Sequence, residues 1–187
     1  MNGDLEATRQ RYRPVGPLHL LFLGESPPPG RGFFYTGDST LFRVTKPVFV
    51  RVCDFPSDPD AWLAAFAEAG CYLDDFSPTR GDKPHARPNA ADVRDAIRRL
   101  TRLVSEGQPT VVVPVLREIA DLAGQVVAAS ARPETPLRVL RFRTSGASAR
   151  RRSSQVASLQ YFASSDAALA RSLTRQTSSR LATRRLP

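Results

Sequence analysis

Residues 18–42 read LHLLFLGESPPPGRGFFYTGDSTLF. The first six of these residues form a nearly continuous apolar run that ends at Gly24, a pattern typical of a buried strand. Residues 25–32 contain three consecutive prolines, which are unsuited to a helix interior. Apolar residues then recur at helical spacing over 39–55. The sequence therefore predicts a buried strand, a stiff loop, and a helix that Pro47 kinks or splits.

The rest of the chain alternates between predicted helices and strands. Helical periodicity and capping residues predict helices over 58–69, 89–104 and 116–129. Short apolar or β-branched runs predict strands over 71–73, 110–115 and 137–142. This order favours an α/β fold, namely a three-layer α/β/α sandwich with a short, mainly parallel four-stranded sheet. In such a sheet the ligand crevice lies at the carboxyl ends of the strands.

The composition is typical of one globular domain. The chain has 187 residues, 41% of them hydrophobic, and no apolar run of the roughly 18 residues that a membrane span needs. Residues 1–13 lack the apolar core of a signal peptide, so the sequence predicts a cytoplasmic protein, and we expect a monomer. Two cysteines and two histidines are too few for a disulfide scaffold, a zinc ribbon or a cysteine-bound iron–sulfur cluster. We therefore expect no metal and no cofactor.

The net charge of +9 is concentrated at the carboxyl end of the chain. Residues 143–187 hold nine arginines, ten serines and one acid, a net charge of +8, whereas residues 1–142 carry only +1. This division predicts a polar lead-in over 1–17, an α/β domain over 18–142 and a Ser/Arg-rich basic tail over 143–187. The tail either contacts nucleic-acid phosphates or is a disordered or aberrant segment of low complexity.

The loop after the first strand combines an acid with aromatic rings. Gly24 ends the strand, so Glu25 lies at the edge of the predicted crevice. Phe33 and the two aromatic residues after it place flat apolar surfaces near this carboxylate, and a nucleobase stacks on such surfaces. The predicted helix start at Ser39 adds free backbone N–H groups, which suit a phosphate. These residues indicate a place for a base and a phosphate.

The same stretch resembles a known family. GESP at residues 24–27, followed by GRGFFYTGDSTL at residues 30–41, is similar to the first motif of the uracil-DNA glycosylase superfamily. It is most similar to the members whose motif reads GEAPG and then GRPFVGRAGxLL. A second stretch, CYLDDFSP at residues 71–78, occupies the place of the family's YITNVVKCRP, a strand that ends in a base-recognition asparagine. By element order the resemblance covers roughly the first 140 residues.

The resemblance implies hydrolysis of the N-glycosidic bond of a damaged or deaminated base flipped out of DNA, as in base excision repair. Cleavage develops positive charge on the sugar and negative charge on the leaving base. By motif position, Glu25 would hold or activate the attacking water, and Phe33 would stack on the base. The other base contacts would come from Gly24, Ser26 and Asp75. Contacts with the DNA backbone would come from Pro27, Pro28, Arg31, Ser39 and Ser145.

Two departures from the family pattern bear on the chemistry. The family's histidine followed by Pro-Ser is replaced by RFRTSG at residues 141–146, so the donor to the leaving base must be backbone, arginine or absent. Asp75 replaces the recognition asparagine, and an ionised carboxylate only accepts hydrogen bonds. We hypothesise that the protein is not a strict uracil enzyme. It either prefers a base with an amino or altered edge, or burial raises the pKa of Asp75.

Simpler explanations exist for the same residues. Glu25 is also compatible with an ordinary loop acid, and Phe33 and Phe34 are compatible with core packing. Asp74 and Asp75 fit the description of helix caps or loop acids. The alternative function is a catalytically inactive module of the same fold that binds DNA or a nucleobase. A nucleotide hydrolase lacks support, because the sequence has no P-loop.

Overall fold

The computed structural model of the chain describes residues 2–28, 30, 32–77 and 90–138. Its centre is a parallel sheet with the strand order β2-β1-β3, formed by β1 (Leu20–Gly24), β2 (Cys71–Asp75) and β3 (Val111–Pro114). Every residue of the three strands is buried, as expected where helices cover a parallel sheet. The chain is thus a mixed α/β protein with a three-stranded parallel sheet in its described part.

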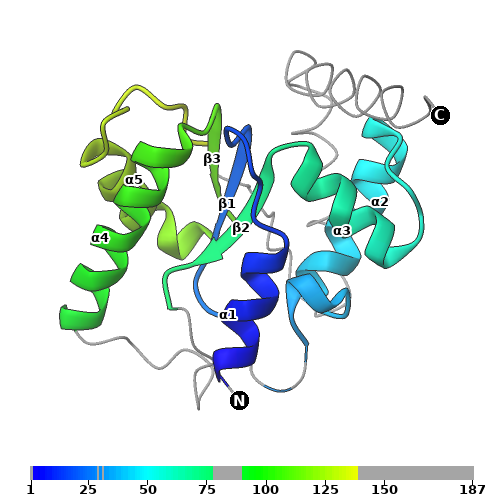
Figure 1. The fold of residues 1–187 in the computed structure, drawn as a ribbon. Coiled ribbons are helices and arrows are strands. Elements are labelled where there is room, and N and C mark those ends of the chain that lie inside the picture. Colours follow the sequence, from blue (N-terminus) through cyan, green and yellow to red (C-terminus); the bar gives the residue numbers. More distant parts are fainter. Residues whose placement is uncertain (1, 29, 31, 78–89, 139–187) are drawn as a thin grey trace, which may run out of the picture.

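Helices lie between the strands, as the alternating pattern predicts, and also before β1 and after β3. In order, the longer ones are α1 (Asn2–Arg11), α2 (Thr40–Cys53), α3 (Pro59–Glu68), α4 (Ala90–Gly107) and α5 (Ala120–Ala128). Two short 3₁₀ helices, η1 (Phe34–Thr36) and η2 (Arg117–Ile119), precede α2 and α5. Figure 1 shows α4 and α5 to the left of the sheet and α2 and α3 to its right, with α1 beside β2. None of the helices in the described residues is both long and apolar enough to cross a membrane.

Local capping explains where two of the helices begin. The Ser39 hydroxyl accepts a hydrogen bond from the Phe42 N–H at 3.1 Å and so caps α2. Asp58 caps α3 in the same way, through the Ala61 N–H at 2.9 Å. The predicted split at Pro47 does not occur, because α2 continues through the proline as one helix. The 3₁₀ turn of η2 takes up the first residues of the predicted 116–129 helix.

The amino-terminal segment differs from the polar lead-in expected over 1–17. It contains the helix α1, and Leu5, Arg9 and Tyr12 are buried against the domain. These three positions follow the spacing of one helix face. Because the middle one is an arginine, the face does not show the apolar stripe by which a packed helix is recognised in sequence. The domain therefore begins before residue 18.

Aromatic packing holds the loop after β1 against the core. Phe34 makes ring contacts with Phe42, Trp62 and Phe66, and Trp62 stacks on Phe66 with 4.9 Å between ring centroids. Tyr35 fixes the next position, since its hydroxyl donates to the Leu73 carbonyl at 2.9 Å and accepts from the Leu73 N–H at 2.7 Å. These bonds satisfy the outer edge of β2, and they tie the loop to the sheet.

The fourth predicted strand, over 137–142, lies only partly within the described residues. Leu137 forms an isolated parallel bridge with Val112 of β3. Two hydrogen bonds support the bridge, from the Val112 N–H to the Pro136 carbonyl at 3.0 Å and from the Arg138 N–H to the Val112 carbonyl at 2.9 Å. Residues 139–142 and the predicted tail over 143–187 lie outside the described part.

Candidate functional site

A cavity of about 240 Å³ lies at the carboxyl ends of the strands. We call it the sheet-end cavity. The residues predicted from sequence that line it are Gly24, Glu25, Ser26, Pro27, Pro28, Phe33, Ser39 and Asp75. Apolar side chains, among them Leu41, Leu73, Val115 and Leu116, complete its wall. Eight of the ten predicted site residues therefore meet at one place, while Arg31 and Ser145 lie outside the described residues.

Glu25 enters the cavity from the first residue after β1. Backbone bonds fix its position, since the Ser77 N–H donates to the Glu25 carbonyl at 2.8 Å and the Phe76 N–H donates to the Gly24 carbonyl at 2.9 Å. The residue is half-buried. No hydrogen bond or ion pair to its carboxylate comes from the part of the chain that the structure describes. The carboxylate is therefore available to a ligand or a water molecule in the cavity.

Phe33 forms part of the cavity wall and is only 1% exposed. The Arg9 guanidinium lies over its ring, with 5.6 Å from Cζ to the ring centroid, and Tyr35 meets the ring edge-on at 5.6 Å between centroids. The ring is thus held by its neighbours and contributes a wall rather than an open platform. Phe34, by contrast, is 3% exposed and packs in the aromatic core.

Asp38 holds the backbone of the loop that carries Phe33. Its Oδ1 accepts hydrogen bonds from the Phe33 N–H at 2.8 Å and from the Thr36 hydroxyl at 2.6 Å. Partial burial works against ionisation of this acid, but these two bonds and the nearby Arg43 lower its pKa. Asp38 is therefore a positioning residue for the loop. Ser39, and not Asp38, caps the following helix α2.

Ser26, Pro27 and Pro28 line the mouth of the cavity, with Pro28 exposed and Pro27 buried. Ser39 is 5% exposed, and its hydroxyl oxygen already caps α2. The hydroxyl proton and one lone pair of the Ser39 oxygen are left for contact with a ligand. The predicted role of these residues in contacting DNA stays a prediction.

Asp75 ends β2 and packs against Gly24 at the end of β1. The two residues are partners in the parallel register. An ideal Cβ on Gly24 would lie 2.1 Å from Asp75 Oδ1, so only glycine leaves room for this carboxylate. Burial raises the pKa of Asp75 to about 7, with Arg9 opposing the rise and the Asp74 carboxylate adding to it.

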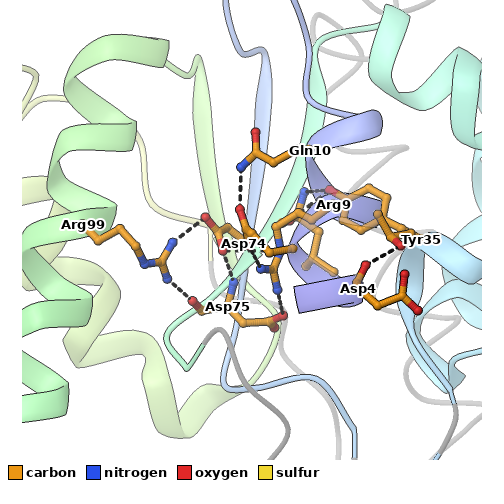
Figure 2. Close-up of polar contacts among 10 residues, drawn as sticks. Asp4, Arg9, Gln10, Tyr35, Asp74, Asp75 and Arg99 are labelled. Carbon is orange, nitrogen blue, oxygen red and sulfur yellow. Dashed lines mark hydrogen bonds and ion pairs between the residues drawn. The ribbon is translucent and has the colours of Figure 1, made fainter. Parts of the chain in front are cut away.

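Two arginines hold the acidic pair, and we call Arg9, Asp74, Asp75 and Arg99 the arginine–aspartate cluster. Arg9 Nη2 lies 2.9 Å from Asp75 Oδ2, and its Nε lies 3.6 Å from Asp74 Oδ1. Arg99 approaches from α4, with Nη1 2.7 Å from Asp74 Oδ2 and Nη2 donating to the Asp75 carbonyl. Figure 2 shows the two aspartates between Arg9 on one side and Arg99 on the other.

This cluster corrects the interpretation of Asp74 and Asp75 as helix caps or loop acids. Both belong to β2 and are only 5% and 4% exposed. Burial of two adjacent carboxylates is tolerated because the guanidinium groups compensate their charge. Burial disfavours a charged Arg9, but Asp74 and Asp75 outweigh that effect and raise its pKa.

A larger cavity of about 490 Å³ lies beside α3, at the opposite ends of β1 and β2. Its lining includes Arg11, Arg13, His19, Asp60 and Glu68, and none of the predicted site residues. We assign the site to the smaller cavity, because ligands bind at the carboxyl ends of parallel strands and the buried acid lies there. No three side chains of metal-ligand type gather anywhere in residues 2–77 and 90–138, leaving aside 29 and 31.

Comparison with other proteins leaves this geometry as the basis for assigning a function. No protein-family model, curated protein or solved structure significantly matches the chain.

Proposed function

We propose that this protein is a uracil-DNA-glycosylase-like hydrolase that cleaves the N-glycosidic bond of a base flipped out of DNA. The observation that carries the proposal is the shared cavity. Glu25, Phe33 and Asp75, which sequence reasoning assigned to the water, the base ring and the base edge, all line the same space. They come from two different strand ends and a loop, so their meeting depends on the fold and not on sequence proximity.

The size of the cavity suits a small planar ring. At about 240 Å³ it lies below the range of roughly 300–1,000 Å³ that is usual for drug-sized ligands and cofactors. Its mostly apolar wall excludes water from the face of a base, and Asp75 supplies a polar group for the edge. A dinucleotide cofactor would not fit such a space.

The chemistry follows from the position of Glu25. A half-buried carboxylate with no partner among the described residues can orient a water molecule toward the sugar carbon. Its negative charge also stabilises the positive charge that develops on the sugar as the bond to the base breaks. The departing base leaves with the bonding electron pair, and the water adds to the sugar carbon and loses a proton.

We infer that the complete sheet has a fourth strand beside β3 and forms the middle of a three-layer α/β/α sandwich. The parallel bridge between Leu137 and Val112 supports a fourth strand that begins at Leu137, next to β3. The helices on the two sides of the sheet in Figure 1 support the layered arrangement.

DNA is the proposed partner, bound by a monomeric protein in the cytoplasm. Pro27 and Pro28 at the mouth of the cavity would pack against the backbone of the strand that carries the flipped base. The charge of +8 over 143–187 supports a further contact with phosphates. Removal of residues 143–187 should then flatten the salt dependence of DNA binding.

Excision from oligonucleotides tests the proposal. Uracil, hypoxanthine, xanthine or a mismatched thymine is placed at one position, and strand cleavage after alkaline treatment reports abasic sites. We expect Glu25→Gln to lower excision by about 10²-fold or more, because an amide cannot take up a proton from water. The matched control is Glu106→Gln, an exposed glutamate in the last turn of α4, which should leave excision unchanged.

The alternative function has a distinct result in the same assay. A catalytically inactive module would bind the oligonucleotides, with affinity that falls steeply with salt, and would release no base from any of them. That result, with folded protein, would overturn the proposal of a hydrolase.

A further inference from the structure

Arg9 contacts two of the residues that line the sheet-end cavity. Its Nη2 lies 2.9 Å from Asp75 Oδ2, and its Cζ lies 5.6 Å from the centroid of the Phe33 ring. Arg9 is itself 1% exposed and lies behind the cavity wall. A single guanidinium on α1 therefore fixes the position of both side chains.

The contact with Arg9 leaves one oxygen of Asp75 for the cavity. Oδ2 accepts the hydrogen bond from Arg9, whereas Oδ1 lies 2.1 Å from the ideal Cβ position of Gly24. Gly24 and Asp75 both line the cavity. No donor from the described residues reaches Oδ1. Asp75 lines the cavity, and an oxygen there that no protein donor reaches can accept a hydrogen bond from a bound ligand.

We propose that Arg9 is a positioning residue that presents Oδ1 of Asp75 to the bound base, and that this oxygen selects between amino and oxo bases. The inference rests on the proposed function, because it takes the occupant of the cavity to be a base. An ionised carboxylate accepts an N–H from an exocyclic amine and repels a carbonyl oxygen. A protonated carboxyl can instead donate its hydrogen to a carbonyl oxygen.

The charges around Asp75 decide which form is present. Burial raises its pKa to about 7, so both forms are populated near neutral pH. The charged groups that act on it are Arg9 on α1, Asp74 on β2 and Arg99 on α4. Two further acids lie near this group, since Glu6 pairs with Arg9 and Glu25 lines the same cavity. Arg9 is the cation in contact with the carboxylate, so its removal raises the pKa of Asp75 further. The preference for amino bases should therefore grow as pH rises, and Arg9 should set the pH at which it changes.

The test compares bases that differ in one exocyclic group. Free cytosine and uracil, and free adenine and hypoxanthine, are titrated into the full chain by calorimetry at pH values on both sides of neutrality. For the unsubstituted protein we expect the amino-to-oxo preference to change about tenfold to a hundredfold across neutrality, as for loss of one buried hydrogen bond. Asp75→Asn should remove the pH dependence and favour uracil and hypoxanthine throughout.

Variants of Arg9 separate positioning from a structural role. Arg9→Met should move the change in preference to higher pH, and Arg9→Lys, which keeps the charge, should restore it toward the original pH. The matched control is Arg98→Met, because the Arg98 side chain is 73% exposed and pairs only with Asp95 among the described residues. This control should leave the preference and its pH dependence unchanged.

If Arg9 is purely structural, Arg9→Met should weaken the binding of all four bases alike and leave unchanged the pH at which the preference between amino and oxo bases changes. That result would overturn the inference. Retention of the pH dependence by Asp75→Asn would overturn it as well. If Arg9→Met does not fold, Arg9→Lys and Asp75→Asn still decide the matter. Free bases separate the two proposals. A pH-dependent preference without excision refutes only the hydrolase, and excision without that preference refutes only this inference.

Discussion

The ionisation of Asp75 should make the stability of the protein fall as pH rises toward neutrality. Burial raises the pKa of Asp75 from an ordinary value of 3.8 to about 7. Between these values the folded state keeps a proton that the unfolded state has released. A state that binds more protons is favoured at low pH, so this contribution to stability is fully present below about pH 4 and is lost as pH rises through about 7.

The size of the effect follows from the shift. A rise of about three pKa units, at 1.36 kcal/mol for each, corresponds to a loss of roughly 4 kcal/mol in the free energy of unfolding. We expect Asp75→Asn to abolish this loss, because an amide does not titrate in this range. The stability of the variant should therefore depend less steeply on pH than that of the original protein.

Urea unfolding at a series of pH values measures the effect. The fluorescence of Trp62 reports the transition, since it is the only tryptophan in the sequence and is 0% exposed. The matched control is Asp95→Asn on α4, where the side chain is 71% exposed. This variant should leave the pH dependence of the free energy of unfolding unchanged. Parallel stability curves for the original protein and Asp75→Asn would refute the reasoning, because Asp75 would then titrate alike in the folded and unfolded states.

Two further substitutions test how the site is held. Tyr35→Phe should destabilise the protein by about 1–3 kcal/mol in urea unfolding, because it leaves both backbone groups of Leu73 without a partner, and an unchanged midpoint would contradict this. Gly24→Ala should destabilise it by a similar amount, about 1–3 kcal/mol, because its Cβ would clash with Asp75 Oδ1. If the clash is the cause, Gly24→Ala should cost less stability when it is made in the Asp75→Gly variant, which lacks the clashing carboxylate. Destabilisation by the double variant equal to the sum of the two single variants would contradict the proposed clash.

The sheet could be predicted from the sequence because its strands are short, continuous apolar runs. The residues 20–24, 71–75 and 111–114 form strands close to the predicted bounds, and all are buried on both faces. The starts of α2 and α3 could also be predicted, because Ser39 and Asp58 are strong capping residues. The rule that ligands bind where parallel strands end placed Glu25 at the predicted crevice, whereas Ser26, Pro27 and Pro28 came from the resemblance to the glycosylase motif.

The arginine–aspartate cluster could not be predicted in this way. Arg9 and Asp75 are 66 positions apart, and nothing local in the sequence indicates that they pair. The sequence therefore left Asp74 and Asp75 compatible with helix caps or loop acids, although both belong to a buried strand. The one available signal was the spacing of Leu5, Arg9 and Tyr12 on a single helix face, which the charge of Arg9 concealed.

Direct detection of the released base gives the clearest test of the claim that Glu25, Phe33 and Asp75 form one base-excising site. The protein is mixed in excess with an oligonucleotide that carries a single uracil, or hypoxanthine in a parallel sample, and free base is quantified by chromatography over time. We predict release of at least one of these bases by the original protein and loss of that release in Glu25→Gln. Equal release by Glu25→Gln, or no release by the folded original protein, would contradict the account.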